Sequence, residues 1–524
     1  MTITLDRRRF LGASVGMAAA LAAGACLPSR RPTSWAPGSD LFTLGVASGE
    51  PEPSGVVLWT RLAPDPLAGG GMPSQSVQVE WEVADDERFG RVVQRGIEET
   101  GPELGHSVHA EVRGLDPERW YWYRFRVGQE LSPVGRTRTS PAAGRTPDRL
   151  AFAMVSCQHY EQGYYTAYRH VADEDLDLVV HLGDYIYEGA SAAGQPRLHE
   201  GDREPQTLED YRNRYAQYRF DADLQAAHAA FPWVTTWDDH EVDNNYAADV
   251  PEDPPLQSRE QFLARRAAAY QAYYEMMPLR AASRPQGPDM LLYRVLRLGQ
   301  LAALHVMDTR QYRTDQACGD GRRVDCREAL DPSRTMIGPD QERWLLESLG
   351  QSDARWNVLA QQVFLAQLDF LPGPGEGLSM DAWDGYPAAR ERLLRFIAER
   401  ALANTIALTG GLHSHWVADL KENFDDPASR SLGSEFVVSS ISSGGDGVDL
   451  EPQTRAILAE NPHIKFYNGR RGYVVNTLTP SEWRADYRAL PFVTSRGAPV
   501  TTRASFLVEA GRAGVHQIAG DPAL

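Results

Sequence analysis

The sequence predicts a layered α/β catalytic domain preceded by a small β-sandwich of the fibronectin type III or immunoglobulin kind. Three observations carry this prediction: alternating strands up to residue 139, continuous apolar runs after residue 150, and helical spacing between many of those runs. Continuous apolar runs are typical of strands covered on both faces, and intervening helices are typical of α/β domains. At 524 residues the chain is too long for one core, so we expect more than one domain.

Residues 1–36 are predicted to be an export signal and linker. "RRRFLGASVGMAAALAAGAC" places Arg7 to Arg9 before Phe10, then a short apolar region, then the small residues that end at Ala25. This order is typical of a twin-arginine signal, although a basic tail followed by a loose helix is the alternative. We therefore expect export through the twin-arginine machinery to the periplasm or beyond. Cys26 follows directly, so a lipid anchor there competes with simple cleavage.

Charge and hydropathy exclude two classes of protein. The chain has 71 acidic and 53 basic side chains, for a formal charge of -18. Phosphate backbones are bound by basic surfaces, so nucleic acid is not the expected partner, whereas an acidic surface attracts divalent cations. No apolar run reaches the roughly 18 to 20 residues of a membrane-spanning helix, so we expect no transmembrane segment in the mature chain.

Residues 40–139 carry the pattern of the β-sandwich. "GVVLWTRL", "VQVEWEVADD", "HSVHAEVRGL" and "RWYWYRFRVG" alternate apolar and polar positions, with Gly, Pro and Asp between them. The segment contains no catalytic constellation, so we interpret it as a packing or binding module. "TSPAAGRTPDR", residues 139–149, reads as a linker.

Residues 150–505 are predicted to form the catalytic domain, and 506–524 a C-terminal tail. Apolar runs such as "LAFAMVSC", "DLVVHLGD", "LAALHVMDTR" and "TIALTGGLH" are continuous. "SREQFLARRAAAYQAYYEMM" and "PDQERWLLESLG" have the apolar spacing of amphipathic helices. The second helix carries Asp340 near its start, where a carboxylate is favourable.

Polar side chains stand where these strands are predicted to end. They are Cys157, Asp184, Asp238, Asp239, His240, Asp308, Gln361, Gln362 and His413. An Asp after a strand is commonly a turn former or a helix cap, so each residue alone is weak evidence. In open α/β sheets, however, ligands bind at the carboxyl ends of strands, so we expect these residues to converge on one site.

The side chains at these strand ends favour metal binding. In "VVHLGDYIYEG", residues 179–189, Asp184 and Tyr187 follow a buried strand within one tight turn. Cys157 is a core residue or a ligand, because Cys318 and Cys326 flank "CGDGRRVDC" and would pair in an oxidising compartment. Thiolate and phenolate suit ferric iron, whereas carboxylate and amide oxygens suit calcium. Two ions sharing a carboxylate can activate water and neutralise a phosphoryl group.

Seven motifs in order resemble the PhoD-like alkaline phosphatase family. They are "SCQHY" from 156, "GDYIYEG" from 183, "WDDHEVDNNY" from 237, "MDTRQYRTD" from 307, "AWDGYPAARERLL" from 382, "GLHSHW" from 411 and "SSISSGGDG" from 439. The family is related to the purple acid phosphatases and the wider metallophosphoesterases. The resemblance implies a metallophosphoesterase-like catalytic domain after an export signal and a β-sandwich.

The resemblance also implies two metal ions. Ferric iron, Fe(3+), would be held by Cys157, Asp184, Tyr187 and His413. Calcium, Ca(2+), would lie beside it, bridged by Asp184 and bound by Asp239, with Asn244 as a weaker ligand.

Several neighbouring residues receive other roles. His240 is interpreted as a hydrogen-bond donor to the transferring phosphoryl group, with a cap or surface position as the alternative. Arg310 would fork onto phosphate oxygens, or would instead pair with Asp308 and hold a loop. Tyr185 reads as an ordinary half-buried ring, and His415 as a residue behind the ligands or in the pocket, because side chains two apart on extended chain face opposite ways.

One position departs from the family pattern. The family usually has Asp where this chain has Gly411, and that carboxylate belongs to the second metal. We expect weaker calcium retention, with water, Asn244 or Asp446 as substitutes.

The sequence as a whole favours an exported alkaline phosphatase that hydrolyses phosphate esters with metal-activated water. Two rivals stay open: a phosphodiesterase or phospholipase-D-like hydrolase, and a non-catalytic cell-envelope binding protein with a relic metal site.

Overall fold

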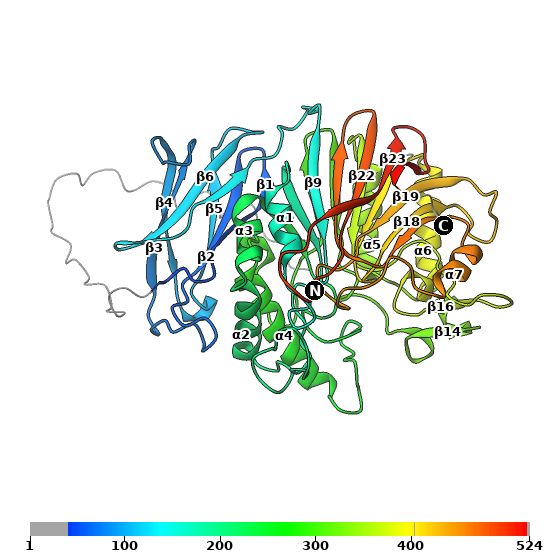
Figure 1. Cartoon of the computed structure of the whole chain (residues 1–524), viewed down its shortest axis with the longest axis horizontal. Coiled ribbons are helices and arrows are strands. Elements are labelled where there is room, and N and C mark those ends of the chain that lie inside the picture. The colour runs from blue at the N-terminus through cyan, green and yellow to red at the C-terminus, as the bar shows by residue number, and fades with distance from the viewer. Residues whose placement is uncertain (1–39, 403, 521–524) are drawn as a thin grey trace, which may run out of the picture. The chain divides into compact units, whose positions relative to one another are not determined.

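The computed structural model describes residues 40–402 and 404–520 (Figure 1). The predicted export signal, its arginines and Cys26 lie outside the described residues. All described residues fall in one unit of the chain, which begins at Gly38. Among them, no helix combines the length and the apolar character needed to cross a membrane.

The larger sheet of the described region has ten strands, of which β9, β10, β11 and β1 run parallel in the middle. Their order is β24 (His516–Gly520), β23 (Thr501–Glu509), β22 (Glu482–Leu490), β21 (Arg471–Leu478), β9 (Leu150–Val155), β10 (Leu178–Leu182), β11 (Pro232–Thr236), β1 (Val46–Glu52), β2 (Gly55–Arg61) and β5 (Ser107–Arg113). Residues 506–520 of the predicted tail therefore include the end of β23 and all of β24, which pair with each other.

The smaller sheet of the described region has seven strands, and β13, β15, β17 and β19 run parallel in it. Their order is β12 (Arg294–Leu298), β13 (Ala302–Val306), β15 (Trp356–Gln361), β17 (Thr405–Thr409), β19 (Ser431–Val437), β18 (His415–Lys421) and β20 (Ile464–Asn468). Two short strands, β14 (Arg322–Val324) and β16 (Gly377–Ser379), pair apart from both sheets.

Helices cover the outer face of each sheet, as Figure 1 shows. They are α1 (Thr166–Asp173), α2 (Leu208–Arg219), α3 (Ala222–Ala230), α4 (Arg259–Met276), α5 (Gly338–Gly350), α6 (Pro387–Glu399) and α7 (Thr454–Glu460). The two helices expected from the sequence are α4 and α5. Ser258 and Gln261 form a capping box at the start of α4, which satisfies amide groups that the helix itself leaves free.

Three apolar cores separate these layers. In β9, Leu150, Phe152 and Met154 face the core between the sheets, while Ala151, Ala153 and Val155 face α1 to α4. This alternation follows from the two-residue period of a strand. A third core lies between the smaller sheet and the helices α5 and α6, so both faces of both central sheets are buried. The α/β class predicted from continuous apolar runs is confirmed.

The N-terminal strands divide between two sheets. β1, β2 and β5 belong to the larger sheet, and β1 pairs in parallel with β11, Ser48 opposite Pro232. The remainder form a separate sheet of β3 (Val77–Ala84), β4 (Val92–Thr100), β6 (Trp120–Val127), β7 (Glu130–Leu131) and β8 (Gly135–Arg138). One layer of the predicted sandwich is thus continuous with the catalytic sheet, and the boundary near residues 139–150 stays a prediction.

Candidate metal centre

The parallel strands of both sheets end at one cavity of about 310 Å³. Asp184 follows β10, Asp239 follows β11, Arg310 follows β13, and His413 follows β17. The carboxyl ends of parallel strands meet at one edge of a sheet, and here the edges of two sheets face the same space. Asp184, Asp239 and His413, which the sequence predicts to converge, do line one cavity, and Arg310 lines it with them.

The four predicted iron ligands meet at one point. A ligand atom from each of Cys157, Asp184 and His413 lies within 4.8 Å of the other two. The Tyr187 hydroxyl donates to Asp184 Oδ2 at 2.8 Å and lies 3.0 Å from His413 Nε2. A sulfur, a carboxylate, a phenol and an imidazole from distant parts of the chain therefore lie close together.

A second group of ligand atoms shares one residue with the first. Asp184, Asp239 and His240 also place ligand atoms within 4.8 Å of one another. Asn244 lines the cavity, and its side-chain amide donates to Glu252 Oε1 at 2.5 Å. Asp184 thus belongs to both groups of ligand atoms.

Three of the predicted ligands lie in left-handed backbone. Cys157, Asp184 and His413 adopt left-handed φ angles of 58°, 57° and 53°. Such conformations are costly for residues with a side chain and persist at functional sites where the fold imposes them. Gly183 has φ 99°, and a Cβ there would lie 2.5 Å from the Asp238 amide nitrogen. The Gly-Asp pair therefore ends β10 in a turn that only glycine permits at its first position.

The donor set fits a highly charged cation. Asp184 Oδ1 is buried and accepts no hydrogen bond within the described structure. Burial and the nearby Asp184 carboxylate raise the pKa of the Cys157 thiol and of the Tyr187 phenol. Without a cation these groups would stay protonated, and thiolate and phenolate are the forms that bind metal. The unpaired carboxylate oxygen, the thiol and the phenol are therefore typical of a site that binds a cation.

His240 packs against Tyr187 and is held in place by Glu188. Its Nδ1 lies 2.7 Å from Glu188 Oε2, and its ring lies over Tyr187 with the centroids 4.1 Å apart. Burial opposes the charged imidazolium, but the carboxylates of Glu188, Asp239 and Asp184 raise the His240 pKa well above its usual value. Glu188, the second acid of "GDYIYEG", thus orients a proton-bearing imidazole, a role that sequence reasoning missed.

Arg310 contacts carboxylates within the protein. Its Nε donates to Asp238 at 2.6 Å, and its two terminal nitrogens donate to Asp381 at 2.7 and 2.9 Å. Asp239 lies 3.5 Å from the same guanidinium. Asp308 accepts from the Arg310 backbone instead, at 3.0 Å. The guanidinium therefore ties three acidic side chains together.

Other polar residues at the strand ends have structural partners. Gln362 donates to Thr236 Oγ1 and to the Met307 carbonyl, each at 2.9 Å, and so links the two sheets. His415 is buried in β18, where its Nδ1 accepts from the Ser439 amide at 3.0 Å. Neither residue lines the cavity.

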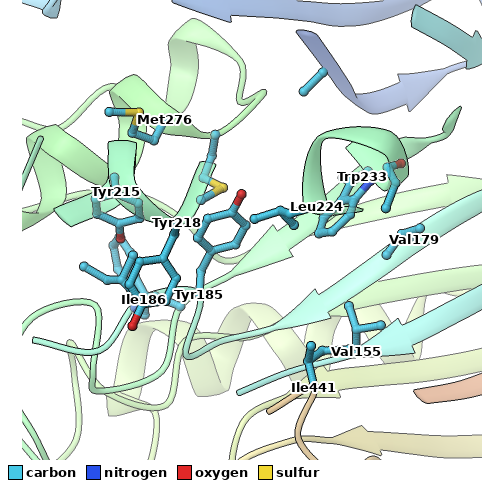
Figure 2. Close-up of a cluster of buried hydrophobic side chains, with 14 of the residues drawn as sticks. Val155, Val179, Tyr185, Ile186, Tyr215, Tyr218, Leu224, Trp233, Met276 and Ile441 are labelled. Carbon is cyan, nitrogen blue, oxygen red and sulfur yellow. Dashed lines mark hydrogen bonds between the residues drawn. The ribbon is translucent and has the colours of Figure 1, made fainter. Parts of the chain in front are cut away.

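Tyr185 is a core residue. Figure 2 shows its ring among Tyr215, Tyr218 and Leu224, and its hydroxyl lies 2.9 Å from His228 Nε2. The two tyrosines of "DYIY" thus separate: the first is buried in the core and the second lies at the ligands. Tyr185 is fully buried rather than half-buried as expected, because α2 and α3 cover it.

The backbone conformation explains why position 411 is a glycine. Its φ is 72°, and a Cβ would lie 2.8 Å from the Gln362 carbonyl oxygen and 3.4 Å from Asp238 Oδ2. A side chain would need the backbone to move, and the Asp238 carboxylate already occupies the neighbouring space. Asp446 accepts hydrogen bonds from Val493 and Thr494 and does not line the cavity, so it does not replace a ligand here.

Sequence reasoning missed much of the cavity wall. Asp381 binds Arg310 and Arg313, and the Asn245 backbone N–H donates to Asp239 Oδ2 at 2.8 Å. Asn245 lies within one of the family motifs and Asp381 directly precedes another, so proximity to those motifs was the available signal. The apolar wall has no such signal, and its residues are Val363, Phe364, Leu368, Phe370 and Leu412.

Comparisons with known proteins agree with this geometry. The model of the PhoD-like phosphatase family matches residues 152–487, and that of the PhoD-like phosphatase N-terminal domain matches 27–141. The chain belongs to the PhoD-like phosphatase family. It is 54% identical over 527 residues to alkaline phosphatase D of Bacillus subtilis (strain 168), covering 98% of this chain and 89% of that protein. A solved structure of PhoD superposes with a TM-score of 0.91 at 55% identity and covers 94% of each chain.

Proposed function

We propose that this PhoD-like phosphatase is a metal-dependent phosphoric ester hydrolase of the alkaline phosphatase D type. The observation that carries the proposal is the shared Asp184, which belongs to two overlapping groups of ligand atoms at the end of the cavity. The similarity to alkaline phosphatase D over nearly the whole chain supports the same activity.

The proposed ions are Fe(3+) and Ca(2+). Cys157, Tyr187, His413 and Asp184 supply the donors that favour ferric iron. Asp184 and Asp239 supply carboxylates for calcium, and Asn244 adds an amide oxygen at the cavity wall. Asp238, beside Gly411, is a better substitute for the missing family carboxylate than Asp446.

The residues of the chain have distinct tasks in this proposal. A bound metal pair supplies Lewis acidity, which polarises a phosphoryl oxygen and makes water a stronger nucleophile. His240, with Nδ1 held by Glu188, presents Nε2 as a donor to the phosphoryl oxygens. Arg310 acts through Asp238, Asp239 and Asp381 by fixing their carboxylates, rather than by forking onto phosphate.

Export through the twin-arginine pathway to the periplasm or beyond is part of the proposal. The arginine motif at residues 7–9 supports it, and so does the disulfide between Cys318 and Cys326, because disulfides persist in oxidising compartments. Replacing Arg7, Arg8 and Arg9 by Lys should hold the protein in the cytoplasm, as measured by cell fractionation.

The test joins metal analysis, visible absorption and kinetics on the purified protein. We expect iron and calcium in the protein, a charge-transfer colour, and release of phosphate from a monoester. A diester and a phospholipid assayed in parallel decide between the hydrolase classes. A colourless, iron-free and inactive protein after correct export would favour the binding-protein alternative.

His240→Asn provides the matched variant for the proposed donor. We expect its kcat to fall by about 100-fold with iron content unchanged, since positioned donors to a developing charge have effects of this size. An unchanged kcat would remove His240 from the proposed chemistry.

A further inference from the structure

The cavity has a second wall that carries none of the proposed metal ligands. Phe364, Leu368, Phe370 and Leu412 supply its apolar surface, and Arg322 and Ser379 stand at its edge. Ligand sites typically combine such apolar surface with a few polar groups that fix orientation. In the proposed function the metal-binding end of the cavity binds the phosphoryl group of the ester. The apolar wall would then face the organic part of the ester.

Arg322 differs from the other charged groups around the cavity. Its guanidinium stacks on Phe370, 3.6 Å from the ring centroid, and no hydrogen bond or ion pair joins that guanidinium to another described residue. Arg310 is held by three carboxylates, and Asp384 pairs with Arg390. Among the described residues that line the cavity, Arg322 is therefore the guanidinium whose N–H groups have no acceptor in the protein.

The loop around Arg322 is built to hold it in place. The disulfide between Cys318 and Cys326 closes the loop, and Arg322 pairs with Ser379 in the ladder of β14 and β16. Asp320, in the same loop, accepts from the Asn245 side chain at 2.7 Å. Stacking on Phe370 restricts the remaining freedom of the guanidinium, and such pre-organisation lowers the entropy lost on binding.

We infer that Arg322, Phe370 and the adjoining apolar side chains form a leaving-group subsite for an alcohol that carries a second anionic group. The inference rests on the proposed hydrolase function and adds a substrate class to it. A planar guanidinium forms paired hydrogen bonds with carboxylate or phosphate oxygens. With one face of Arg322 covered by Phe370, its edges remain open for such an anion.

The acidic residues of the cavity are compatible with this assignment. Asp320 is the acid nearest in sequence to Arg322, and its Oδ2 is bound by Asn245 rather than by the arginine. Asp381 is bound by Arg310 and Arg313. A cationic leaving group would instead favour Asp320, so charge on the substrate discriminates between the two possibilities.

Three matched esters test the inference: phenyl phosphate, 4-carboxyphenyl phosphate and 4-(trimethylammonio)phenyl phosphate. Arg322→Ala should lower kcat/KM at least about tenfold for the carboxylate ester, the effect of losing one charge-assisted contact. Phenyl phosphate should change by less than about twofold. Comparing variant with wild type for each ester cancels differences in leaving-group reactivity.

Arg323→Ala is the matched control. Arg323 is the next residue of β14, donates to the Gly319 carbonyl at 3.0 Å and does not line the cavity. We expect it to leave the preference for the carboxylate ester unchanged. Equal losses on all three esters in Arg322→Ala, or a larger loss for the trimethylammonio ester than for the carboxylate ester, would overturn the inference.

A binding measurement separates this inference from the proposed hydrolase function. Calorimetry with benzylphosphonate and 4-carboxybenzylphosphonate needs no turnover. Wild type should bind the carboxylate compound more tightly, and Arg322→Ala should lose that difference. Equal binding of the two compounds by wild type would refute the subsite even in an active enzyme, whereas selective binding without hydrolysis would keep the subsite and refute the hydrolase.

Discussion

The two sides of the cavity are built in different ways. The proposed metal-binding side lies at strand ends of both central sheets, and its predicted ligands are buried except for Asn244 and His413, which are half-buried. The opposite wall at Arg322 belongs to the exposed strand β14, in a loop closed by one disulfide. The contrast teaches that the chemistry is fixed by the architecture of the sheets, whereas recognition of the leaving group rests on a loop that can change without disturbing them.

The largest expected effect comes from the residue that both groups of ligands share. Asp184→Asn keeps a residue that tolerates left-handed backbone but removes the negative charge. We expect kcat/KM to fall roughly a thousandfold or more and both metals to be lost, because in the proposed site one carboxylate would serve two ions. Metal analysis and kinetics measure this, with circular dichroism to verify folding. Loss of only one metal would show that Asp184 does not bridge.

The tyrosine pair of "DYIY" sharpens the comparison between ligand and core. Tyr187→Phe removes the phenol that lies against Asp184 and His413, so the visible absorption band should shift or vanish and iron affinity should fall about 10- to 100-fold. Tyr185→Phe removes the hydroxyl contacts with His228 and Arg219 and should keep the colour, while lowering the free energy of unfolding by about 1 kcal/mol. Identical spectra for the two variants would contradict the ligand assignment.

Gly411 tests whether strain or charge explains the departure from the family pattern. Gly411→Ala should lower the free energy of unfolding by about 1–3 kcal/mol, because its left-handed backbone and the Gln362 carbonyl both oppose a Cβ. Gly411→Asp should be no more stable than Gly411→Ala, since the Asp238 carboxylate lies next to the new side chain. Denaturant unfolding measures both. Gly144→Ala is the control, because Gly144 has φ 82° but an added Cβ would have nothing within 4 Å of it. We expect this variant to lower the free energy of unfolding by less.

The smallest effect is expected at the disulfide. Replacing Cys318 and Cys326 by Ser should raise KM for 4-carboxyphenyl phosphate about threefold, because the loop that carries Arg322 loses its closure. The kcat for phenyl phosphate should not change, since the metal ligands lie on other loops. A thiol titration confirms the starting bond. A loss of bound metal in this variant would show instead that the two sides of the cavity are coupled, through Asp320 and Asn245.

The sequence by itself determined the candidate ligands and the ends of the strands. Continuous apolar runs and the residues that stop them are local patterns, so Cys157, Asp184, Asp239 and His413 could be named as candidates from their places along the chain. The disulfide could be anticipated for the same reason, because its two cysteines flank one short loop. Tyr187 and the division of the ligands between two ions came from the resemblance to the PhoD-like family.

Tertiary structure decided which partner each polar group takes. Arg310 pairs with Asp381, 71 residues away, and the carbonyl of Gln362, just after β15, leaves no room for a Cβ at Gly411. The stacking of Arg322 on Phe370 and the pairing of β1 with β11 were also decided by tertiary structure. Hydrogen bonding, steric exclusion and charge pairing act over a few ångströms of space, whereas sequence patterns report only on neighbours along the chain.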